Sequence, residues 1–476
     1  MMVEVPQSRT AASEPTLRLN ESDASLAAHD RVLGPLAGIK IRYNPDRSCR
    51  QGRSRKRIEN WTVAVVILLF TNLFPNSEDP NYGIFVYRRA KQLCDRLAHS
   101  VYVVAPVPYF PNWLPIPRKV RSLPRISHWL KMSRIPVKEQ RDGMTVYHPR
   151  YFMVPTISAP FHGFLMFLGT ILLILRLHKQ LRFDCVDAHF VYPDGFAAVL
   201  VGRFLRLPVV VTAHGTDLNL YAQFSLLRPL IRWTLNGAER VICVSLALKS
   251  IVLHLNIPNN KVVVIHNGVD LNCFRPTDKT EARLMLGVPL DAEVVLAVGQ
   301  LIPRKGYLLL ICAVARLSLK FPKLKLFIVG EGRLGESLQR KVSSLGLDGC
   351  VSLMGAVKNE ELFRWYSAAD VTCLTSSREG FPCALLESLA CGTPVVATAV
   401  GGTTELINSQ DLGILVRQDV FSISEGLERA LQINWIGRSV ARHVHSFTWE
   451  QAAVEVEEIL ACSIKLDRNS NLGRRP

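Results

Sequence analysis

The chain has 476 residues, which is enough for two to four domains of ordinary size. Hydrophobic residues make up 48% of it and charged residues 20%, a globular composition that excludes a wholly disordered chain or a coiled coil. The 57 Lys and Arg residues outnumber the 40 Asp and Glu residues, so the formal net charge is +17. Where this surplus lies along the chain bears on the partners of the protein.

The first segment, residues 1–60, is polar, rich in Ser and Arg, and poor in aromatic residues. Such a composition buries too little apolar surface to form a core. We therefore expect a disordered basic extension here, or a stretch that lies upstream of the true start. The run Arg53–Arg57 allows a second interpretation, a basic address that binds nucleic acid, although short basic runs also arise by chance.

The largest local surplus of positive charge lies in residues 88–150, which hold thirteen basic and three acidic residues. Within them, residues 111–138 hold seven basic residues, no acidic residue, and both Trp113 and Trp129. Cations interleaved with aromatic side chains suit an anionic membrane surface or a polyanionic ligand. A solvated loop with a skewed charge explains the pattern equally well.

The eleven cysteines are scattered, with no C-x-x-C pair and no spacing typical of metal ligands. Their odd number fits a reducing cytosol better than a disulfide scaffold. No apolar run reaches the roughly 18 to 20 uncharged residues that span a bilayer. We interpret the longest such run, Phe161–Leu175, as a core helix rather than an interfacial one.

From Trp61 onward, short apolar runs rich in β-branched residues alternate with helical stretches, a pattern that indicates parallel sheets covered on both faces. The first series of strands is expected at 63–70, 100–107, 185–190, 208–214, 240–245 and 261–265. The second is expected at 293–298, 324–329, 350–353, 371–375, 394–398 and 413–416. Two such series predict an α/β protein with two doubly wound domains.

The joint between these domains is expected near Asn267–Thr280, which is rich in turn-forming residues and lacks apolar periodicity. We assign residues 61–270 to the first domain and 271–445 to the second. Residues 446–462 predict an amphipathic helix with acidic residues on its polar face, and residues 463–476 form a tail.

In doubly wound sheets, ligands bind where loops leave the carboxyl ends of the strands. After the strand 293–298 comes Gly299 and then the triplet Arg304-Lys305-Gly306. Adjacent cations on a glycine-flanked loop suit a diphosphate, because Arg offers a fork of donors and Lys a point charge. Such pairs are also common on ordinary surfaces.

After the strand 371–375 comes a loop with Glu379 and then a helix that carries Glu387. Pro382 stands where a first-turn proline belongs, and Gly392 ends the helix. The free N–H groups of the first turn suit phosphate oxygens, and the two carboxylates suit sugar or ribose hydroxyls. The structural alternative is one acid at a helix N-terminus and one ordinary helical Glu.

Three further strand-end loops are candidates for binding: Tyr82-Gly83 after the first strand, His214-Gly215-Thr216-Asp217 at the end of the strand 208–214, and Gly401-Gly402 before a helix. A single histidine at a strand end is as often a structural residue as a functional one.

Together these pieces resemble the retaining family-4 glycosyltransferases, including those that build bacterial surface polysaccharides such as teichuronic acid. Glu379 and Glu387, eight apart in EGFPCALLE, are similar to the E-x7-E motif of that family, and the other pieces follow in the family's order. The resemblance covers roughly residues 61–462. His266 departs from it, because the family more often has Pro there.

The resemblance implies a GT-B fold, in which two Rossmann-like domains face each other across a cleft. The acceptor side would be residues 61–270 with the returning helix 446–462, and the nucleotide-sugar side residues 271–445. Arg304 and Lys305 would hold the donor diphosphate and stabilise the charge that grows on it. Glu379 would bind hydroxyls of the transferred sugar, and Glu387 those of the ribose.

On the acceptor side, His214 would lie near the reacting carbon, and Asp217 would either position the acceptor or, as we slightly prefer, cap the next turn. Gly83 would lack a side chain so that its loop can approach the diphosphate. The other donor-binding positions implied by the resemblance are Gly299, Gly380, Phe381, Cys383, Ala384 and Gly402.

The resemblance further implies transfer, with retention, from a nucleotide sugar to a saccharide or lipid-linked acceptor in cell-surface polysaccharide synthesis. UDP is the nucleotide that the resemblance leads us to expect, and GDP and ADP stay open as alternatives. No D-x-D metal motif stands in a suitable loop, so no metal or other cofactor is expected. We expect a cytoplasmic protein, peripheral at the inner membrane face, with the segment 111–138 on anionic lipid.

Two alternatives remain at this point. A nucleotide-sugar epimerase of the same architecture would also bind a sugar diphosphate, but it is not expected to carry the E-x7-E setting with the Arg-Lys loop. A basic nucleic-acid-binding protein would explain the net charge of +17, but it leaves the two glutamates without a purpose.

Overall fold

The computed structural model describes residues 65–96, 100–109, 132–153 and 159–472. The predicted extension 1–60 and the segment 111–131, with both its tryptophans, therefore lie outside the described residues.

The first sheet has eight strands in the order β10-β9-β8-β7-β1-β2-β5-β4. All pairs are parallel except β4 and β5, and the central strands β7 and β8 are buried along their whole length. The strands are β1 (Val66–Phe70), β2 (Ser100–Val104), β4 (Lys138–Arg141), β5 (Met144–Tyr147), β7 (Cys185–His189), β8 (Val209–Ala213), β9 (Arg240–Cys243) and β10 (Val262–Val264).

The strands around residue 140 were not expected from the hydrophobic pattern. β4 has the sequence KEQR and lies at the edge of the sheet, where a strand needs no apolar face. The Asp142-Gly143 turn, with φ of 45° and 81°, joins it to β5 as a two-residue hairpin, and this dipeptide was the available signal. The predicted strand 100–107 also divides, because β3 (Val107–Tyr109) leaves the sheet and pairs with β6 (Arg150–Phe152).

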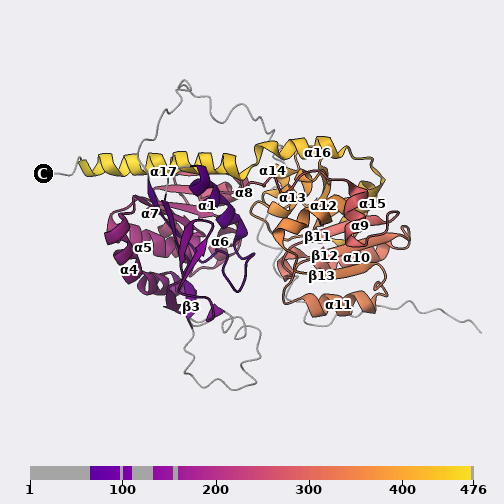
Figure 1. Cartoon of the computed structure of the whole chain (residues 1–476), viewed down its shortest axis with the longest axis horizontal. Helices are drawn as coiled ribbons and strands as arrows, with labels where there is room; N and C mark the ends of the chain where they lie inside the picture. The colour runs from indigo at the N-terminus through magenta and orange to yellow at the C-terminus, as the bar shows by residue number, and fades with distance from the viewer. Residues whose placement is uncertain (1–64, 97–99, 110–131, 154–158, 473–476) are drawn as a thin grey trace, which may run out of the picture. The chain divides into compact units, whose positions relative to one another are not determined.

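Helices cover the first sheet. Helix α1 (Ile84–Arg96) contacts the last helix, α17 (Trp449–Leu472), which also reaches β7 and β8 (Figure 1). Helix α17 is ten residues longer at its end than the predicted helix 446–462. Between the strands lie α4 (His162–Leu181), α5 (Phe196–Leu205), α6 (Thr216–Asn219), α7 (Arg228–Gly237) and α8 (Leu246–His254).

The second sheet has six strands, all parallel, in the order β13-β12-β11-β14-β15-β16. They are β11 (Glu293–Val298), β12 (Leu324–Val329), β13 (Val351–Gly355), β14 (Val371–Leu374), β15 (Val395–Thr398) and β16 (Gly413–Val416). Their helices are α9 (Lys279–Leu286), α10 (Tyr307–Leu317), α11 (Gly335–Ser344), α12 (Leu362–Ala368), α13 (Cys383–Ala390), α14 (Thr403–Leu406), α15 (Val420–Gln432) and α16 (Gly437–His443). The predicted α/β architecture with two doubly wound sheets is confirmed. The predicted division at residues 270 and 271 falls between β10 and α9.

The interpretation of 161–175 as a core helix is wrong for one face of α4. Only Gly163, Met166, Thr170, Ile174 and Leu177 of this helix are buried. Among the described residues, Ala159–Leu181 is one helical segment long and apolar enough to cross a membrane by length and composition, yet little of it is buried. Composition could not reveal this, because a core helix and a one-sided helix can be equally apolar.

Candidate functional site

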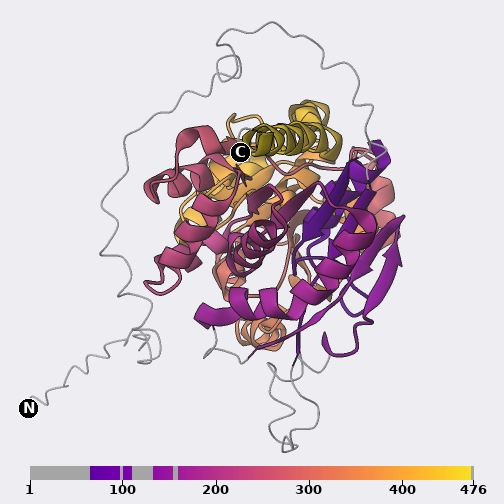
Figure 2. The ribbon, with the colours of Figure 1, turned by 90° about the vertical axis from the view of Figure 1, so that its left-hand side faces the viewer.

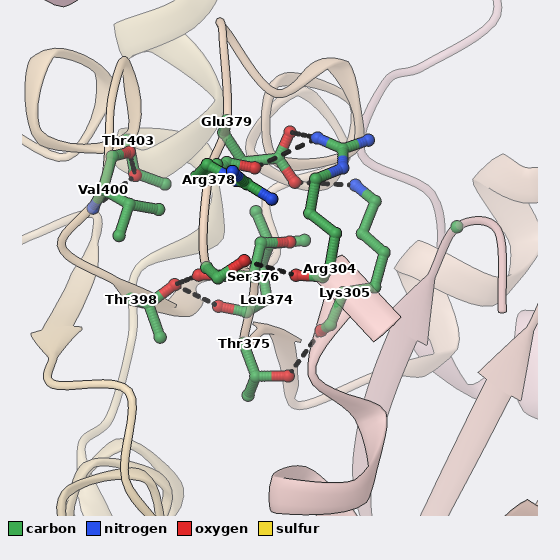
Figure 3. Close-up of polar contacts among 12 residues, drawn as sticks. Arg304, Lys305, Leu374, Thr375, Ser376, Arg378, Glu379, Thr398, Val400 and Thr403 are labelled. Carbon is green, nitrogen blue, oxygen red and sulfur yellow. Dashed lines mark hydrogen bonds and ion pairs between the residues drawn. The ribbon is translucent and has the colours of Figure 1, made fainter. Parts of the chain in front are cut away.

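The cationic loop after β11 closes as one turn of 3-10 helix over Pro303–Lys305 and ends at Gly306, whose φ is 69°. A Cβ at Gly306 would lie 2.2 Å from the carbonyl oxygen of Thr375, closer than any side chain can approach. The glycine therefore lets this loop lie directly on the end of β14. The loop carries both cations to the segment that follows β14 (Figure 3).

Arg304 and Lys305 both point at the carboxylate of Glu379 (Figure 3). Lys305 Nζ donates to Glu379 Oε1 at 2.8 Å, while Arg304 Nη1 lies 3.4 Å from Oε2 and donates to the carbonyl of Arg378 at 3.0 Å. Burial alone would raise the pKa of Glu379, but Lys305 and Arg304 together hold that pKa below its usual value. Two cations facing one carboxylate leave a net positive cluster, which suits a diphosphate.

Hydrogen bonds to the backbone carbonyls of the cationic loop fix the two loops against each other. The Thr375 hydroxyl donates to the carbonyl of Lys305 at 2.9 Å, and the N–H of Ser377 donates to the carbonyl of Arg304 at 2.8 Å. The backbone that carries Arg304 and Lys305 is therefore fixed, so the position of these two cations does not depend only on their ion pairs with Glu379.

The glycines after β15 pack against the same segment. The N–H of Gly402 donates to the carbonyl of Gly380 at 3.0 Å, and a Cβ at Gly401 would lie 2.0 Å from the carbonyl oxygen of Glu379. These positions are glycine because two loop backbones touch there.

Helix α13 starts directly after Pro382. The N–H groups of Cys383 and Ala384 lie in its first turn, where helix geometry offers them no intrahelical acceptor. Burial raises the pKa of Cys383 to about 12, so that its thiol is neutral at physiological pH. Phe381 is buried, with its ring centroid 4.6 Å from that of His266. His266, where the resemblance expects proline, thus packs under this loop.

Glu387 occupies a separate network on α13. Its Oε2 accepts a hydrogen bond from the hydroxyl of Tyr366 at 2.9 Å, and its Oε1 one from Asn359 Nδ2 at 3.4 Å. Burial raises the pKa of Glu387 to about 7, against the opposing effects of Tyr366, Asn359 and the Arg88 charge. Arg88, on α1, donates to Asn359 and forms an ion pair of 3.0 Å with Asp270.

Gly83 has a packing role within its own loop. Its φ is 65°, and a Cβ there would lie 2.3 Å from the carbonyl oxygen of Leu73. The structure therefore gives a reason for this glycine that does not involve a ligand.

His214 follows β8 and belongs to a buried chain of polar groups. Its Nε2 lies 2.9 Å from Nδ1 of His189, whose Nε2 lies 2.7 Å from Nη2 of Arg89. The two imidazole rings are nearly parallel, with centroids 5.2 Å apart, so the facing nitrogens meet edge to edge. Arg89 also donates to Asp187 at 3.0 Å and to Thr212 at 3.1 Å.

This series of hydrogen-bonded groups indicates which ring nitrogens of His189 and His214 carry protons. Burial lowers the pKa of His189 to about 4 and that of His214 well below its usual value, so both rings are neutral. Nε2 of His189 faces Nη2 of Arg89 at 2.7 Å and, further away, Oδ2 of Asp187 at 3.4 Å. Because Arg89 can only donate and is the nearer group, we assign Nε2 of His189 as an acceptor and place its proton on Nδ1. His189 then donates to Nε2 of His214, and the His214 proton is on Nδ1. Among the described residues, that Nδ1 is buried and has no hydrogen-bond partner.

Asp217 caps the turn that follows His214. Its buried carboxylate accepts hydrogen bonds from the N–H groups of Gly215 at 2.7 Å, Val191 at 2.9 Å, His214 at 3.2 Å and Leu218 at 3.2 Å. Of the two roles considered for this residue, the geometry matches the cap.

The loop that carries His214 meets the loop that carries Glu379. A Cβ at Gly380 would lie 2.0 Å from the carbonyl oxygen of His214, and Asn219 Nδ2 donates to the carbonyl of Glu379 at 3.3 Å. A small pocket beside this contact is lined by Thr216, Asn219, Leu220, Arg304 and Arg378. The structure therefore brings Arg304, Lys305, Glu379, Gly380 and the His214 loop together.

Sequence reasoning missed Arg89, Asp187, His189 and the partners of Glu387. The signal available for Asp187 and His189 was two polar residues inside the buried strand CVDAH. Arg88 and Asn359 gave no signal, because they are 271 positions apart and meet only through folding.

The sequence also matches known protein families. The glycosyl transferases group 1 family matches residues 278–464, and glycosyltransferase family 4 matches residues 83–272. TuaC of Bacillus subtilis (strain 168), a glycosyltransferase assigned to teichuronic acid biosynthesis, is 28% identical over 76% of this chain and 88% of its own length. The D-inositol 3-phosphate glycosyltransferase of Thermobispora bispora is 30% identical over 62% of this chain and 74% of its own.

Solved structures of similar fold were also found. Sucrose-phosphate synthase from Thermosynechococcus elongatus has a TM-score of 0.67 at 20% identity, covering 83% of this chain and 98% of that one. Anabaena Alr3699/HepE in complex with UDP has a TM-score of 0.61 at 19% identity, covering 84% and 100%. At this level of identity the likeness shows the fold alone.

Proposed function

Because this chain belongs to the glycosyltransferases of group 1 and family 4, we propose that it transfers a sugar, with retention, from a UDP-sugar to a saccharide or lipid-linked saccharide acceptor. Its membership in the family and its GT-B fold agree with what the sequence led us to expect. Membership favours transfer over the epimerase and nucleic-acid alternatives.

The observation that carries this proposal is the convergence of Lys305 and Arg304 on Glu379, directly beside the His214 loop. In the proposed reaction, the two cations bind the donor diphosphate and stabilise the negative charge that develops on it as the glycosidic bond breaks. Glu379 keeps lone pairs that can accept hydrogen bonds from hydroxyls of the transferred sugar. The N–H groups of Cys383 and Ala384 are available to a phosphate oxygen.

His214 enters the proposal as a hydrogen-bond donor. Its neutral ring offers the Nδ1–H, so it can donate to a sugar hydroxyl or to a phosphate oxygen, but Nδ1 cannot take up a proton. We assign it to orienting the sugar. Glu387 is assigned to the ribose hydroxyls, and the reaction is proposed to need no metal.

The biological role that we propose rests on the name of the relative TuaC. TuaC is assigned to teichuronic acid biosynthesis, which supports a role in cell-surface polysaccharide synthesis for this chain. The UDP complex of Alr3699/HepE supports UDP as the nucleotide. We place the protein in the cytoplasm, at the inner face of the membrane, where nucleotide sugars and lipid-linked acceptors meet.

The test is a donor-hydrolysis screen over UDP-, GDP- and ADP-sugars, followed by NMR of the anomeric proton of the product. Lys305→Met and Glu379→Gln are expected to lower kcat about 100-fold or more. Lys320→Met is the matched control, because it removes a lysine paired with Glu428 at the surface of the same domain. Hydrolysis of no nucleotide sugar, or equal rates for Lys305→Met and the wild type, would refute the proposal.

A further inference from the structure

Helix α4 exposes a stripe of large apolar side chains. Phe161 just before the helix is 63% exposed, Phe164 48%, Leu168 51% and Leu172 69%. Their spacing of three, four and four residues places all four on one side over three turns. The opposite side of the helix packs on the first sheet domain through its buried residues. The stripe is therefore a continuous exposed surface and not a set of scattered residues.

The same side of α4 carries positively charged side chains in its last two turns. Arg176 and Lys179, one and two turns beyond Leu172, are exposed. Helix α5 packs against α4 and exposes Arg203 and Phe204, the latter 62% exposed. Helix α7 packs against α5 and exposes Arg228 and Arg232. Figure 1 shows these three helices on the side that faces the viewer in Figure 2.

Helices α4, α5 and α7, which we call the acid-free face, contain no Asp or Glu. Most protein surfaces mix both signs of charge, so three neighbouring helices with cations and exposed apolar groups alone are unusual.

A groove at one end of the acid-free face is likewise lined by cationic and apolar side chains. It has a volume of about 660 Å³ and is lined by Ser225, Arg228, Pro229, Arg232, Trp233, Asn236, His254, Leu255 and Asn256. None of the described residues that line it carries a carboxylate, and the guanidinium of Arg203 lies 4.5 Å from the ring centroid of Trp233. The lining offers several donors to an anionic group and an indole to an apolar one.

We propose that the acid-free face rests on an anionic lipid bilayer. Phe164, Leu168 and Leu172 enter the boundary between headgroups and acyl chains, and Arg176, Lys179 and Arg203 contact lipid phosphates. The groove of Arg228 and Arg232 holds one lipid phosphate headgroup. This inference rests on the proposed function only for its purpose, which is to bring the protein to a lipid-linked acceptor.

Charge selects the bilayer over a second copy of the chain. A two-fold contact through this face would set its five cations against the same five, with no acid on these helices to neutralise them. An anionic bilayer instead supplies phosphates for every cation, and its apolar interior covers the stripe.

The test is co-sedimentation of the full chain with vesicles of phosphatidylcholine alone or mixed with phosphatidylglycerol. We expect binding to the mixed vesicles that weakens with added salt, and little binding to phosphatidylcholine. The variant Phe164→Ser/Leu168→Ser/Leu172→Ser should bind at least tenfold more weakly. Leu319→Ser, at a position 88% exposed in the other sheet domain, is the matched control and should bind as the wild type does.

Three results would overturn the inference: equal binding of the triple variant and the wild type, equal binding of the wild type to both vesicles, or a dimer in solution that the triple variant abolishes. A second variant, Arg228→Gln/Arg232→Gln, tests the groove and should lose part of the preference for phosphatidylglycerol. If this double variant keeps the full preference for phosphatidylglycerol, the groove does not bind a headgroup.

Donor hydrolysis without vesicles separates this inference from the proposed function. The triple variant should hydrolyse the nucleotide sugar as fast as the wild type, because the substituted residues are on the outer side of α4. A protein that binds vesicles but hydrolyses no donor refutes only the proposed function. A protein that hydrolyses donor but ignores vesicles refutes only the bilayer surface.

Discussion

Among single residues, His189 has the clearest role that the sequence did not predict, which is to orient His214. In the tautomer assigned to it, His189 accepts from Arg89 and donates to His214, and this sets which nitrogen of His214 carries the proton. We expect His189→Leu to lower kcat about tenfold, which corresponds to roughly one lost hydrogen bond to a positioned group, with little change in KM for the donor.

A conservative variant separates orientation from packing. His189→Asn keeps an N–H donor near the position of Nδ1, so it should recover part of the lost kcat. The measurement is steady-state kinetics with ¹⁵N NMR of the imidazole tautomers, in which the His214 signals are identified by their loss in His214→Gln. Equal kcat for the Leu and Asn variants, or an unchanged tautomer in His189→Leu, would count against the assignment.

The raised pKa of Glu387 predicts that UDP binding depends on pH. Its pKa is raised to about 7, so the carboxyl is largely neutral at pH 6 and largely ionised at pH 8. Only the ionised form offers all its lone pairs to ribose hydroxyls, so we expect UDP to bind more tightly as the pH rises through 7. The gain should be at most about tenfold per pH unit. Calorimetric titration of UDP measures it, and Glu387→Gln should flatten the curve.

At the scale of elements, close contact between loops decides the site. Gly306 joins two constraints, since its φ is 69° and a Cβ would collide with the carbonyl of Thr375. Gly306→Ala should displace Arg304 and Lys305, lower kcat about 100-fold and destabilise the fold by about 1–3 kcal/mol.

Gly346 is the matched control for this change. Its φ is 67°, but a Cβ there would meet nothing within 4 Å. Gly346→Ala should therefore show the cost of the backbone conformation alone, about 1 kcal/mol, with wild-type kcat. Thermal unfolding and kinetics of both variants check this. Similar kcat in both would mean that the loop contact does not hold the cations.

At the scale of the whole molecule, Arg88 connects segments that are distant in sequence. It lies on α1, pairs with Asp270 in the crossing between the sheets, and donates to Asn359, which in turn donates to Glu387. Its positive charge also opposes the rise in the pKa of Glu387. Arg88→Met should therefore raise that pKa further and shift the pH midpoint of UDP binding upward. An unchanged midpoint would show that Arg88 does not act on Glu387.

The sequence by itself determined the two doubly wound sheets, because buried parallel strands must be apolar along their length, and three strands of the second sheet were predicted to the residue. It also determined which strand ends carry charge. Only the tertiary structure decided that Arg304 and Lys305 meet Glu379, that Arg89 orders the two histidines, and that α4 is apolar on both its buried and its open side. These outcomes depend on contacts between residues far apart in the chain, and hydrophobic periodicity records which face of an element is apolar but not what that face meets.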